Sequence, residues 1–148
     1  MGTTARDFFS PQEQEEIKEA IMSAELDTSG EIRVHVENSC SGDVMDRTAF
    51  VFKQLGMNKT ALRNGVLIYL AIKNRRFAII GDKGIHAVVP ENFWDDIKSD
   101  MLEHFRNDRF KDGLVQAILN AGIHLKKNFP RAKNDINELS DEISFGKN

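Results

Sequence analysis

The chain has 148 residues, a length typical of one domain, and 41% of them are hydrophobic, which is enough to build one core. Its 20 Lys and Arg against 23 Asp and Glu give a formal net charge of −3, which excludes a general electrostatic attraction to nucleic acid or anionic lipid. The single cysteine, Cys40, excludes an internal disulfide, a four-cysteine zinc site and a CxxC redox pair.

The chain offers no segment suited to crossing a membrane. Its first ten residues contain Arg6 and Asp7 and do not resemble a secretory signal, and its longest apolar run, 65–72, has the length of a strand. A bilayer-spanning helix needs roughly 20 apolar residues. For the chain as given we therefore expect a soluble, monomeric, cytoplasmic protein without a membrane span or a nucleic-acid partner.

The first predicted helix begins at Pro11. Ser10 can cap this helix, proline suits the first helical position, and Glu13 completes a capping box with Ser10. Apolar residues then recur at helical spacing up to residue 24. Residues 31–37 alternate between polar and apolar side chains, which predicts a half-buried strand with one polar face.

The middle of the chain predicts one helix and a hairpin. The helix is expected over about residues 44–55, with Asp43 as its natural cap. Residues 66–72 are continuously apolar, which predicts a strand buried on both faces at the centre of a sheet. A polar turn at 73–76 leads to residues 77–80, which are predicted to pair back as the second arm of a hairpin. Residues 85–89 could form a short fourth strand or an irregular connection.

Three further helices are predicted, starting at Pro90, over about 110–127 and over about 135–144. The first two strands are joined by a helical crossover and should be parallel, whereas the third should be antiparallel. Because the central strand needs cover on both faces, we predict an α/β fold, a three-layer α/β/α sandwich with a small mixed sheet. The single domain would cover residues 1–148, with its core over about 10–128 and a helical extension over 129–148.

Polar residues should gather at one edge of this sheet. Glu31 begins the first strand, Asn64 precedes the second, and Asp82 follows the third, which runs in the opposite direction. Together with Gly65, they form an oxygen-only ligand set, which hard cations such as Ca²⁺ or Mg²⁺ prefer. The same residues also suit turns that bond local backbone, and on composition alone this second role is favoured. The four histidines have no HxxxH or HExxH spacing, so a zinc site is not expected.

Several segments resemble the TPM domain family, whose members include thylakoid lumen proteins, photosystem repair factors and many bacterial proteins. The resemblance covers roughly residues 10–128 and rests on the order and spacing of its motifs. The matching segments are Ser29-Gly30-Glu31-Ile32-Arg33-Val34, then Asn64-Gly65-Val66-Leu67-Ile68, Gly81-Asp82-Lys83-Gly84 and Phe105-Arg106 with Gly113-Leu114.

This resemblance implies the same α/β/α sandwich and a divalent-metal site, often for calcium, at the loop-rich edge of the sheet. It also implies an acid phosphatase activity, which has been proposed for some members. The residues that match positions near the metal site are Glu31, Asn64, Gly65 and Asp82, with Asp112 in the Gly-Leu segment as an addition.

Three functions remain open at this point. The leading hypothesis is a domain that binds Ca²⁺, or alternatively Mg²⁺, and serves in protein association or repair. The second is a metal-dependent acid phosphatase acting on phosphomonoesters, in which Arg33 on the polar face of the first strand would hold the phosphate. The third is a structural interaction module without an ion. Whether the protein is an enzyme is therefore undecided by the sequence.

Overall fold

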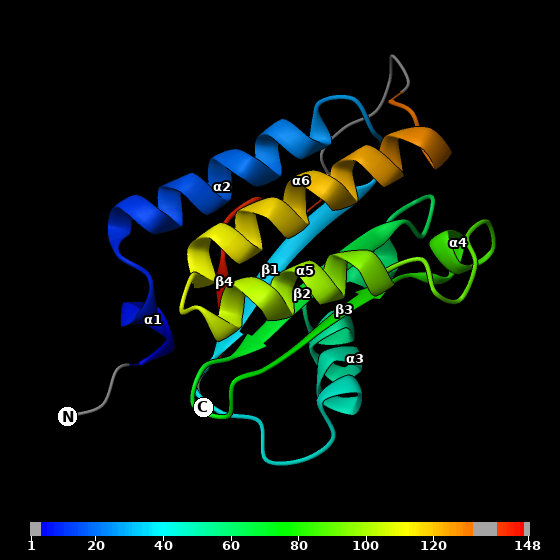
Figure 1. The fold of residues 1–148 in the computed structure, drawn as a ribbon. Helices are drawn as coiled ribbons and strands as arrows, with labels where there is room; N and C mark the ends of the chain where they lie inside the picture. The colour runs from blue at the N-terminus through cyan, green and yellow to red at the C-terminus, as the bar shows by residue number, and fades with distance from the viewer. Residues whose placement is uncertain (1–3, 132–138, 147–148) are drawn as a thin grey trace.

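A mixed β-sheet lies at the centre of the structure, a computed structural model that describes residues 4–131 and 139–146 (Figure 1). The strands of the described residues follow the order β3-β2-β1-β4 across the sheet. β1 is parallel to β2 and to β4, and β3 is antiparallel to β2, as the sequence predicts for the first three strands. The strands are β1 (Glu31–Glu37), β2 (Gly65–Ala71), β3 (Arg76–Gly81) and β4 (Ser144–Phe145).

Helices cover both faces of this sheet, which confirms the three-layer α/β/α sandwich. One face carries α2 (Pro11–Glu25), α5 (Asp95–Arg106) and α6 (Phe110–Asn128), with the short α1 (Ala5–Phe8) beside them. The opposite face carries α3 (Val44–Gln54) and the 3₁₀ turn η1 (Met57–Lys59), and α4 (Lys83–His86) follows β3. None of the described helices is both long and apolar enough to cross a membrane.

The two larger helices of the chain's first half begin where their caps predict. Glu13 donates its backbone N–H to the Ser10 hydroxyl at 3.1 Å, and the Ser10 N–H returns a bond to the Glu13 carboxylate at 3.0 Å. The Asp43 carboxylate accepts the N–H groups of Met45 and Asp46 at the start of α3. These local bonds satisfy helix donors that have no partner within the helix, so the capping residues determine where α2 and α3 begin.

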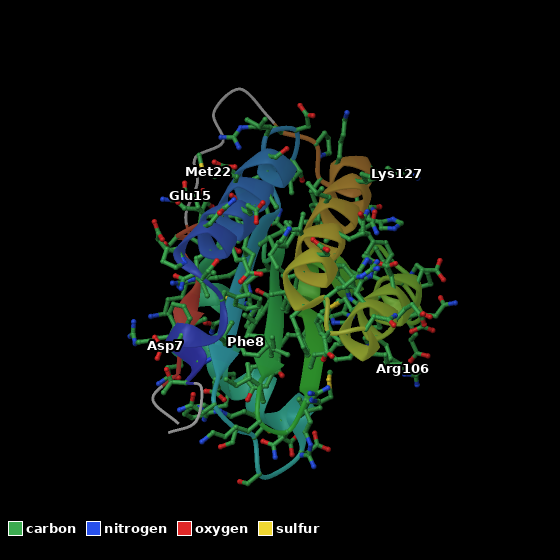
Figure 2. All side chains as sticks on the ribbon, turned by 60° about the vertical axis from the view of Figure 1, so that its left-hand side comes forward. Asp7, Phe8, Glu15, Met22, Arg106 and Lys127 are labelled. Carbon is green, nitrogen blue, oxygen red and sulfur yellow. The ribbon has the colours of Figure 1, made fainter. Side chains whose placement is uncertain are left out.

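Every residue of β2 is buried, and its side chains serve both layers in alternation. Val66, Ile68 and Leu70 pack in the core beneath α2, α5 and α6. The intervening Leu67, Tyr69 and Ala71 belong to a second cluster, which lies beneath α3. Figure 2 shows the outer surface, where Glu15 and Met22 lie on the outer side of α2 and Arg106 and Lys127 mark the last turns of α5 and α6.

Two of the predicted elements differ from the structure, and the alternative left open over 85–89 is decided. Residues 85–89 form no strand: Asp82 caps the short helix α4 and the chain continues as turns, in agreement with an irregular connection. The third predicted helix begins at Asp95 instead of Pro90. The helix predicted over 135–144 is absent from the part of it that the structure describes, 139–144, and its remainder lies outside the described residues. Ser144 and Phe145 instead pair with the free edge of β1.

Gly84 allows the start of α4 to lie directly against the backbone of the segment before β2. Its N–H donates to the carbonyl oxygen of Arg63 at 2.9 Å, and a Cβ on Gly84 would lie 2.3 Å and 2.5 Å from the backbone oxygens of Leu62 and Arg63. Such distances are far below van der Waals contact, so only glycine allows this close approach.

We expect Gly84→Ala to lower the free energy of unfolding by about 2–4 kcal/mol, because the backbone at 62–63 must move away from α4. Urea unfolding followed by circular dichroism measures this loss. Gly42→Ala is the matched control, since a Cβ at Gly42 would meet nothing within 4 Å, and it should change stability by less than about 0.5 kcal/mol. Equal effects of the two substitutions would contradict the role given to Gly84.

Candidate functional site

The structure brings four of the five predicted site residues to one edge of the sheet. Glu31 and Gly65 are partners at the parallel starts of β1 and β2, and the Glu31 N–H points to the Asn64 carbonyl at 3.4 Å. Asp82, just after the end of β3, donates its backbone N–H to the Gly65 carbonyl at 2.9 Å. All four are buried, although three of them carry polar side chains. We call this group, Glu31, Asn64, Gly65 and Asp82, the loop edge.

Arg63, which directly precedes Asn64, contacts the loop edge, and the sequence analysis did not single it out. Its guanidinium forms a two-pronged ion pair with the Asp82 carboxylate, with Nε to Oδ2 at 2.7 Å and Nη2 to Oδ1 at 3.1 Å. Asp82 Oδ1 also accepts the Lys83 N–H at 2.8 Å and thereby caps α4. The hydrogen bond to Asp82 raises the pKa of Arg63. Arg63 itself has a positive φ of 52°, an uncommon backbone conformation for a side-chain-bearing residue.

The other polar groups of the loop edge are tied to neighbouring segments. Glu31 Oε1 accepts the backbone N–H of Leu139 at 2.6 Å, so the C-terminal segment reaches this carboxylate. The Asn64 amide donates to the Ser29 hydroxyl at 3.3 Å. Within the described residues, no group of three or more His, Cys, Asp or Glu side chains is arranged to hold a metal ion. A cation at this edge would therefore depend on amide and backbone oxygens as well as on carboxylates.

Asp112, the fifth predicted residue, lies at the other end of the molecule. It stands in the first turn of α6, is exposed, and pairs with Lys111 at 2.7 Å. The last turn of α6 is the one that meets the start of β1, where Phe129 accepts the Ser29 N–H at 2.9 Å. Because α6 is 19 residues long, Asp112 is separated from the loop edge by nearly the full helix. The ion pair with Lys111 lowers the pKa of Asp112.

A pocket of about 570 Å³ opens at the opposite end of β1, where the sequence analysis placed no site. Its floor carries the buried carboxylate of Glu37, which accepts hydrogen bonds from three side chains. Arg47 donates through Nε at 3.0 Å and also through Nη2, His35 donates through Nε2 at 3.0 Å, and the Tyr69 hydroxyl completes the set. The pocket is lined by His35, Glu37, Arg47, Phe50, Gln54, Leu55, Ser144, Phe145 and Gly146.

Electrostatics keep this Glu37 cluster (Glu37, His35, Arg47 and Tyr69) in one charge state. Burial by itself would raise the pKa of Glu37, but the bonds from Arg47, Tyr69 and His35 outweigh it and hold this pKa below its ordinary value. Burial also lowers the pKa of His35 and raises that of Tyr69. The carboxylate is therefore ionised, the imidazole neutral and the phenol protonated near neutral pH. The sequence carried one signal for this cluster, the row of polar residues along one face of β1.

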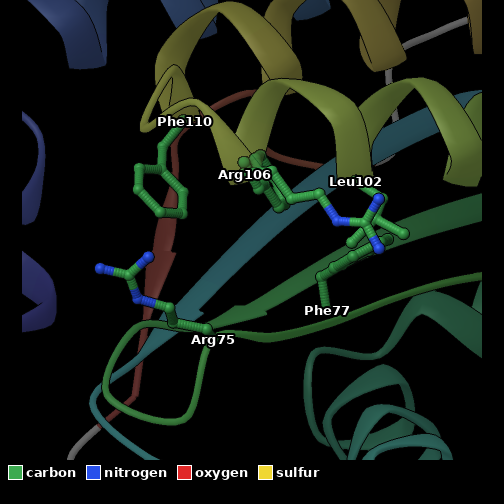
Figure 3. Close-up of a pocket in the computed structure, with 6 residues that line it drawn as sticks. Arg75, Phe77, Leu102, Arg106 and Phe110 are labelled. Carbon is green, nitrogen blue, oxygen red and sulfur yellow. The ribbon is translucent and has the colours of Figure 1, made fainter.

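A smaller, apolar pocket of about 110 Å³ lies between the β2–β3 turn and α5 (Figure 3). Phe77, Leu102 and Phe110 contribute to its lining, and the guanidinium groups of Arg75 and Arg106 stand on two sides of it. Arg75 also lies over the Phe110 ring, 5.9 Å from its centroid. No carboxylate, histidine or hydroxyl group lines this pocket, so it carries no group suited to acid–base or nucleophilic chemistry.

Comparison with known proteins decides the family. The model of the TPM domain family matches residues 3–122. The chain belongs to the TPM domain family. The structure is also similar to the NMR structure of BA42, a protein of the psychrophilic bacterium Bizionia argentinensis, with 47% identity and a TM-score of 0.89. That match covers 94% of this chain and 96% of BA42.

Two more distant structures share the fold of this TPM domain. The N-terminal domain of a protein from P. gingivalis is 21% identical, with a TM-score of 0.68 over 82% of this chain and 79% of that one. The N-terminal domain of cg2496 from Corynebacterium glutamicum is 16% identical, with a TM-score of 0.63 over 79% of this chain and 74% of that one. A search of curated proteins found no match. The family and fold are thus established, while the activity has to be argued from the site.

Glu25 gives the TPM domain a testable dependence on pH. This buried carboxyl group accepts the Ile32 N–H at 2.8 Å, and burial, followed by the hydrogen bond with Asp141, raises its pKa from 4.5 to about 9. A raised folded-state pKa means that the stabilisation is complete below the unfolded value and is lost as the pH rises toward 9.

We expect the unfolding free energy to fall between pH 5 and 9 with a contribution from Glu25 of up to about 1.4 kcal/mol per pH unit. Glu25→Gln should remove that contribution, because an amide binds the same neighbours without titrating. Urea unfolding at several pH values measures the slope, and Glu19→Gln, an exposed change on the same helix, is the control. If Glu25→Gln and the wild type show equal slopes, the Glu25 carboxyl is ionised in the folded protein.

Proposed function

We propose that this TPM domain binds a divalent cation, Ca²⁺ in preference to Mg²⁺, at the loop edge, and that the bound cation serves association with another protein. The observation that carries the proposal is the Asp82–Arg63 ion pair. A nearly buried carboxylate there already holds a positive group, and that group comes from a side chain that is 34% exposed. Arg63 can therefore turn outward and leave the carboxylate to a metal ion.

The chemistry of the loop edge favours a hard cation. Carboxylate oxygens from Glu31 and Asp82 and the amide oxygen of Asn64 would hold it, and no cysteine or histidine is among these residues. Ca²⁺ accepts six to eight oxygen ligands in irregular arrangements and completes its shell with water, whereas Mg²⁺ requires near-octahedral geometry. Ligands that come from three separate loops suit the first ion better. Asp112 has no part in this proposal, because it lies at the far end of α6.

Arg63 and the cation would compete for the Asp82 carboxylate, so a substitution of Arg63 tests the proposal directly. We expect Arg63→Gln to bind Ca²⁺ about tenfold more tightly than the wild type, a difference of about 1.4 kcal/mol, because no guanidinium has to be displaced. Asp82→Asn should abolish binding. The measurement is a Ca²⁺ titration followed by NMR, read at the amides of Gly65, Asp82 and Gly84.

Arg75→Gln is the matched control, since it removes an arginine from the hairpin turn at the opposite end of the sheet and should leave Ca²⁺ affinity unchanged. A melting curve with Ca²⁺ and with chelator gives an independent reading, because a ligand that binds only the folded state raises its stability. If the chemical shifts of these amides do not change at millimolar Ca²⁺ in either the wild type or Arg63→Gln, the proposal is wrong.

Two exposed apolar side chains beside the loop edge support the association role. Leu62, which precedes Arg63, is 54% exposed, and Val88, which follows α4, is 56% exposed. A partner that buries these two side chains would remove their apolar surface from water, which favours association. A partner that covers these residues would also exclude water from the neighbouring ion.

A second candidate, hydrolysis of phosphomonoesters, is favoured by one observation. Arg33, on the polar face of β1, has a buried Nε atom without a hydrogen-bond partner among the described residues. An unpaired guanidinium nitrogen is suited to a phosphate oxygen, and a metal ion at the loop edge would polarise the phosphoryl group.

If the TPM domain is a phosphatase of this kind, Arg33→Gln should lower kcat/KM for an aryl phosphate at least tenfold, because the phosphate loses a charged partner. The assay uses p-nitrophenyl phosphate with and without Ca²⁺ or Mg²⁺, and Arg76→Gln at the first residue of β3 is the control. Activity that is equal with metal and with chelator would contradict this function.

A further inference from the structure

Three side chains in the pocket at the end of β1 are connected in a row. The Ser144 Oγ lies 2.9 Å from His35 Nδ1, and the other ring nitrogen, His35 Nε2, lies 3.0 Å from Glu37 Oε1. All three residues line the same pocket of about 570 Å³. We infer that Ser144, His35 and Glu37 form a nucleophile–base–carboxylate relay that hydrolyses carboxylic esters. This inference is independent of the cation proposed at the loop edge.

The tautomer of His35 follows from its two neighbours. Glu37 accepts bonds from Arg47 and Tyr69 in addition to His35, so it is an ionised acceptor with no proton to give. His35 must therefore carry its proton on Nε2. The lone pair on Nδ1 is left facing Ser144, and the Ser144 hydroxyl must donate to it. A serine hydroxyl that donates to a neutral imidazole held by a carboxylate is the arrangement that activates serine as a nucleophile.

Position in the sheet fixes this geometry. Ser144 belongs to β4 and is the register partner of His35 on β1. The next bond along the ladder, from the Gly146 N–H to the Val36 carbonyl at 2.9 Å, holds the strand beyond Ser144 in place. Nucleophile and base thus stand on two paired strands, and rigid elements position such groups more accurately than loops do.

Charge and wall chemistry select the class of substrate. The Arg47 charge is compensated by Glu37, so the pocket offers little net positive charge to a phosphate dianion. Phe50, Leu55 and Phe145 form apolar walls, which suit an uncharged ester with a short apolar group. Arg47 and Gln54 both line this pocket, and their side chains carry the N–H donors that would stabilise the oxyanion formed during attack.

The reaction needs only water as co-reactant. The Ser144 oxygen forms a bond to the ester carbonyl carbon while its proton passes to His35 Nδ1, and the bond to the alcohol oxygen then breaks as His35 returns the proton to that oxygen. A water molecule next gives a proton to His35 and bonds to the acyl carbon. The bond to Ser144 breaks, the proton returns to the serine oxygen, and the carboxylic acid leaves.

The test uses the full chain and a fluorophosphonate probe, which labels activated serines, together with p-nitrophenyl acetate turnover. We expect the probe to label Ser144, as located by peptide mass spectrometry, and Ser144→Ala to lose both labelling and turnover. His35→Gln should lower both rates about 100-fold or more, the range found for a lost general base. Ser140→Ala, an exposed serine on the same segment, should keep both rates.

Because Ser144→Ala could simply release β4 from the sheet, Ser144→Cys supplies a second reading. Its thiol would face the same imidazole, and we expect iodoacetamide to alkylate it at least tenfold faster than it alkylates the buried Cys40. The inference is overturned if Ser144 is not labelled, if His35→Gln leaves labelling unchanged, or if the Ser144-dependent substrate is p-nitrophenyl phosphate and not the ester. Turnover that persists with chelator supports the relay whatever the outcome of the Ca²⁺ titration.

Discussion

The buried central strand β2 is the constraint on which the rest of the structure depends. All seven of its residues are removed from water, so the sheet has to be covered on both faces. On one face α2, α5 and α6 form a broad layer, but on the other the cover consists of α3 and η1. The polar residues of β1 lie on the less completely covered face, where the pocket at its end is open. Glu31, Arg33, His35 and Glu37 thus form a single polar row along β1.

Buried polar and charged groups on a strand are costly unless they find hydrogen-bond partners. At one end Glu31 accepts the Leu139 N–H, and at the other end Ser144 bonds His35. The C-terminal segment therefore contacts both ends of β1. Helix α3 contributes Arg47, which donates a hydrogen bond to the Glu37 carboxylate. Parts of the chain that are far apart in sequence complete one polar row, and this row would be costly to bury without them.

The features that the sequence revealed are local, and those it concealed are long-range. The caps at Ser10 and Asp43 and the apolar run of β2 act within a few residues, so pattern and spacing suffice to find them. The meeting of Glu31, Asn64 and Asp82 followed from strand direction alone. Neither the β4 pairing nor the Arg63–Asp82 ion pair has a local signature, because β4 is two residues long and Arg63 stands 19 positions before its partner. Motif order also does not say which end of a helix meets the sheet, and the structure places Asp112 in the first turn of α6, away from the loop edge.

The two buried carboxylates that pair with an arginine, Glu37 and Asp82, differ in what would happen if that arginine left. Glu37 would keep the bonds from Tyr69 and His35, but its charge would be buried without a positive partner, and the loss of such a partner commonly destabilises a protein by about 3–5 kcal/mol. A metal ion entering there would also have to displace an imidazole and a phenol. Asp82 depends on Arg63 for two of its three bonds in the described structure, and the third comes from the Lys83 backbone of the helix it caps.

An ion can therefore replace Arg63 at Asp82 without disturbing any other side chain that bonds this carboxylate, whereas the carboxylate of Glu37 is committed to orienting His35. This difference supports the proposals of ion exchange at the loop edge and of fixed proton chemistry at the far end of β1. The two ends of one strand can then serve separate purposes, because neither requires the other's charged groups to move.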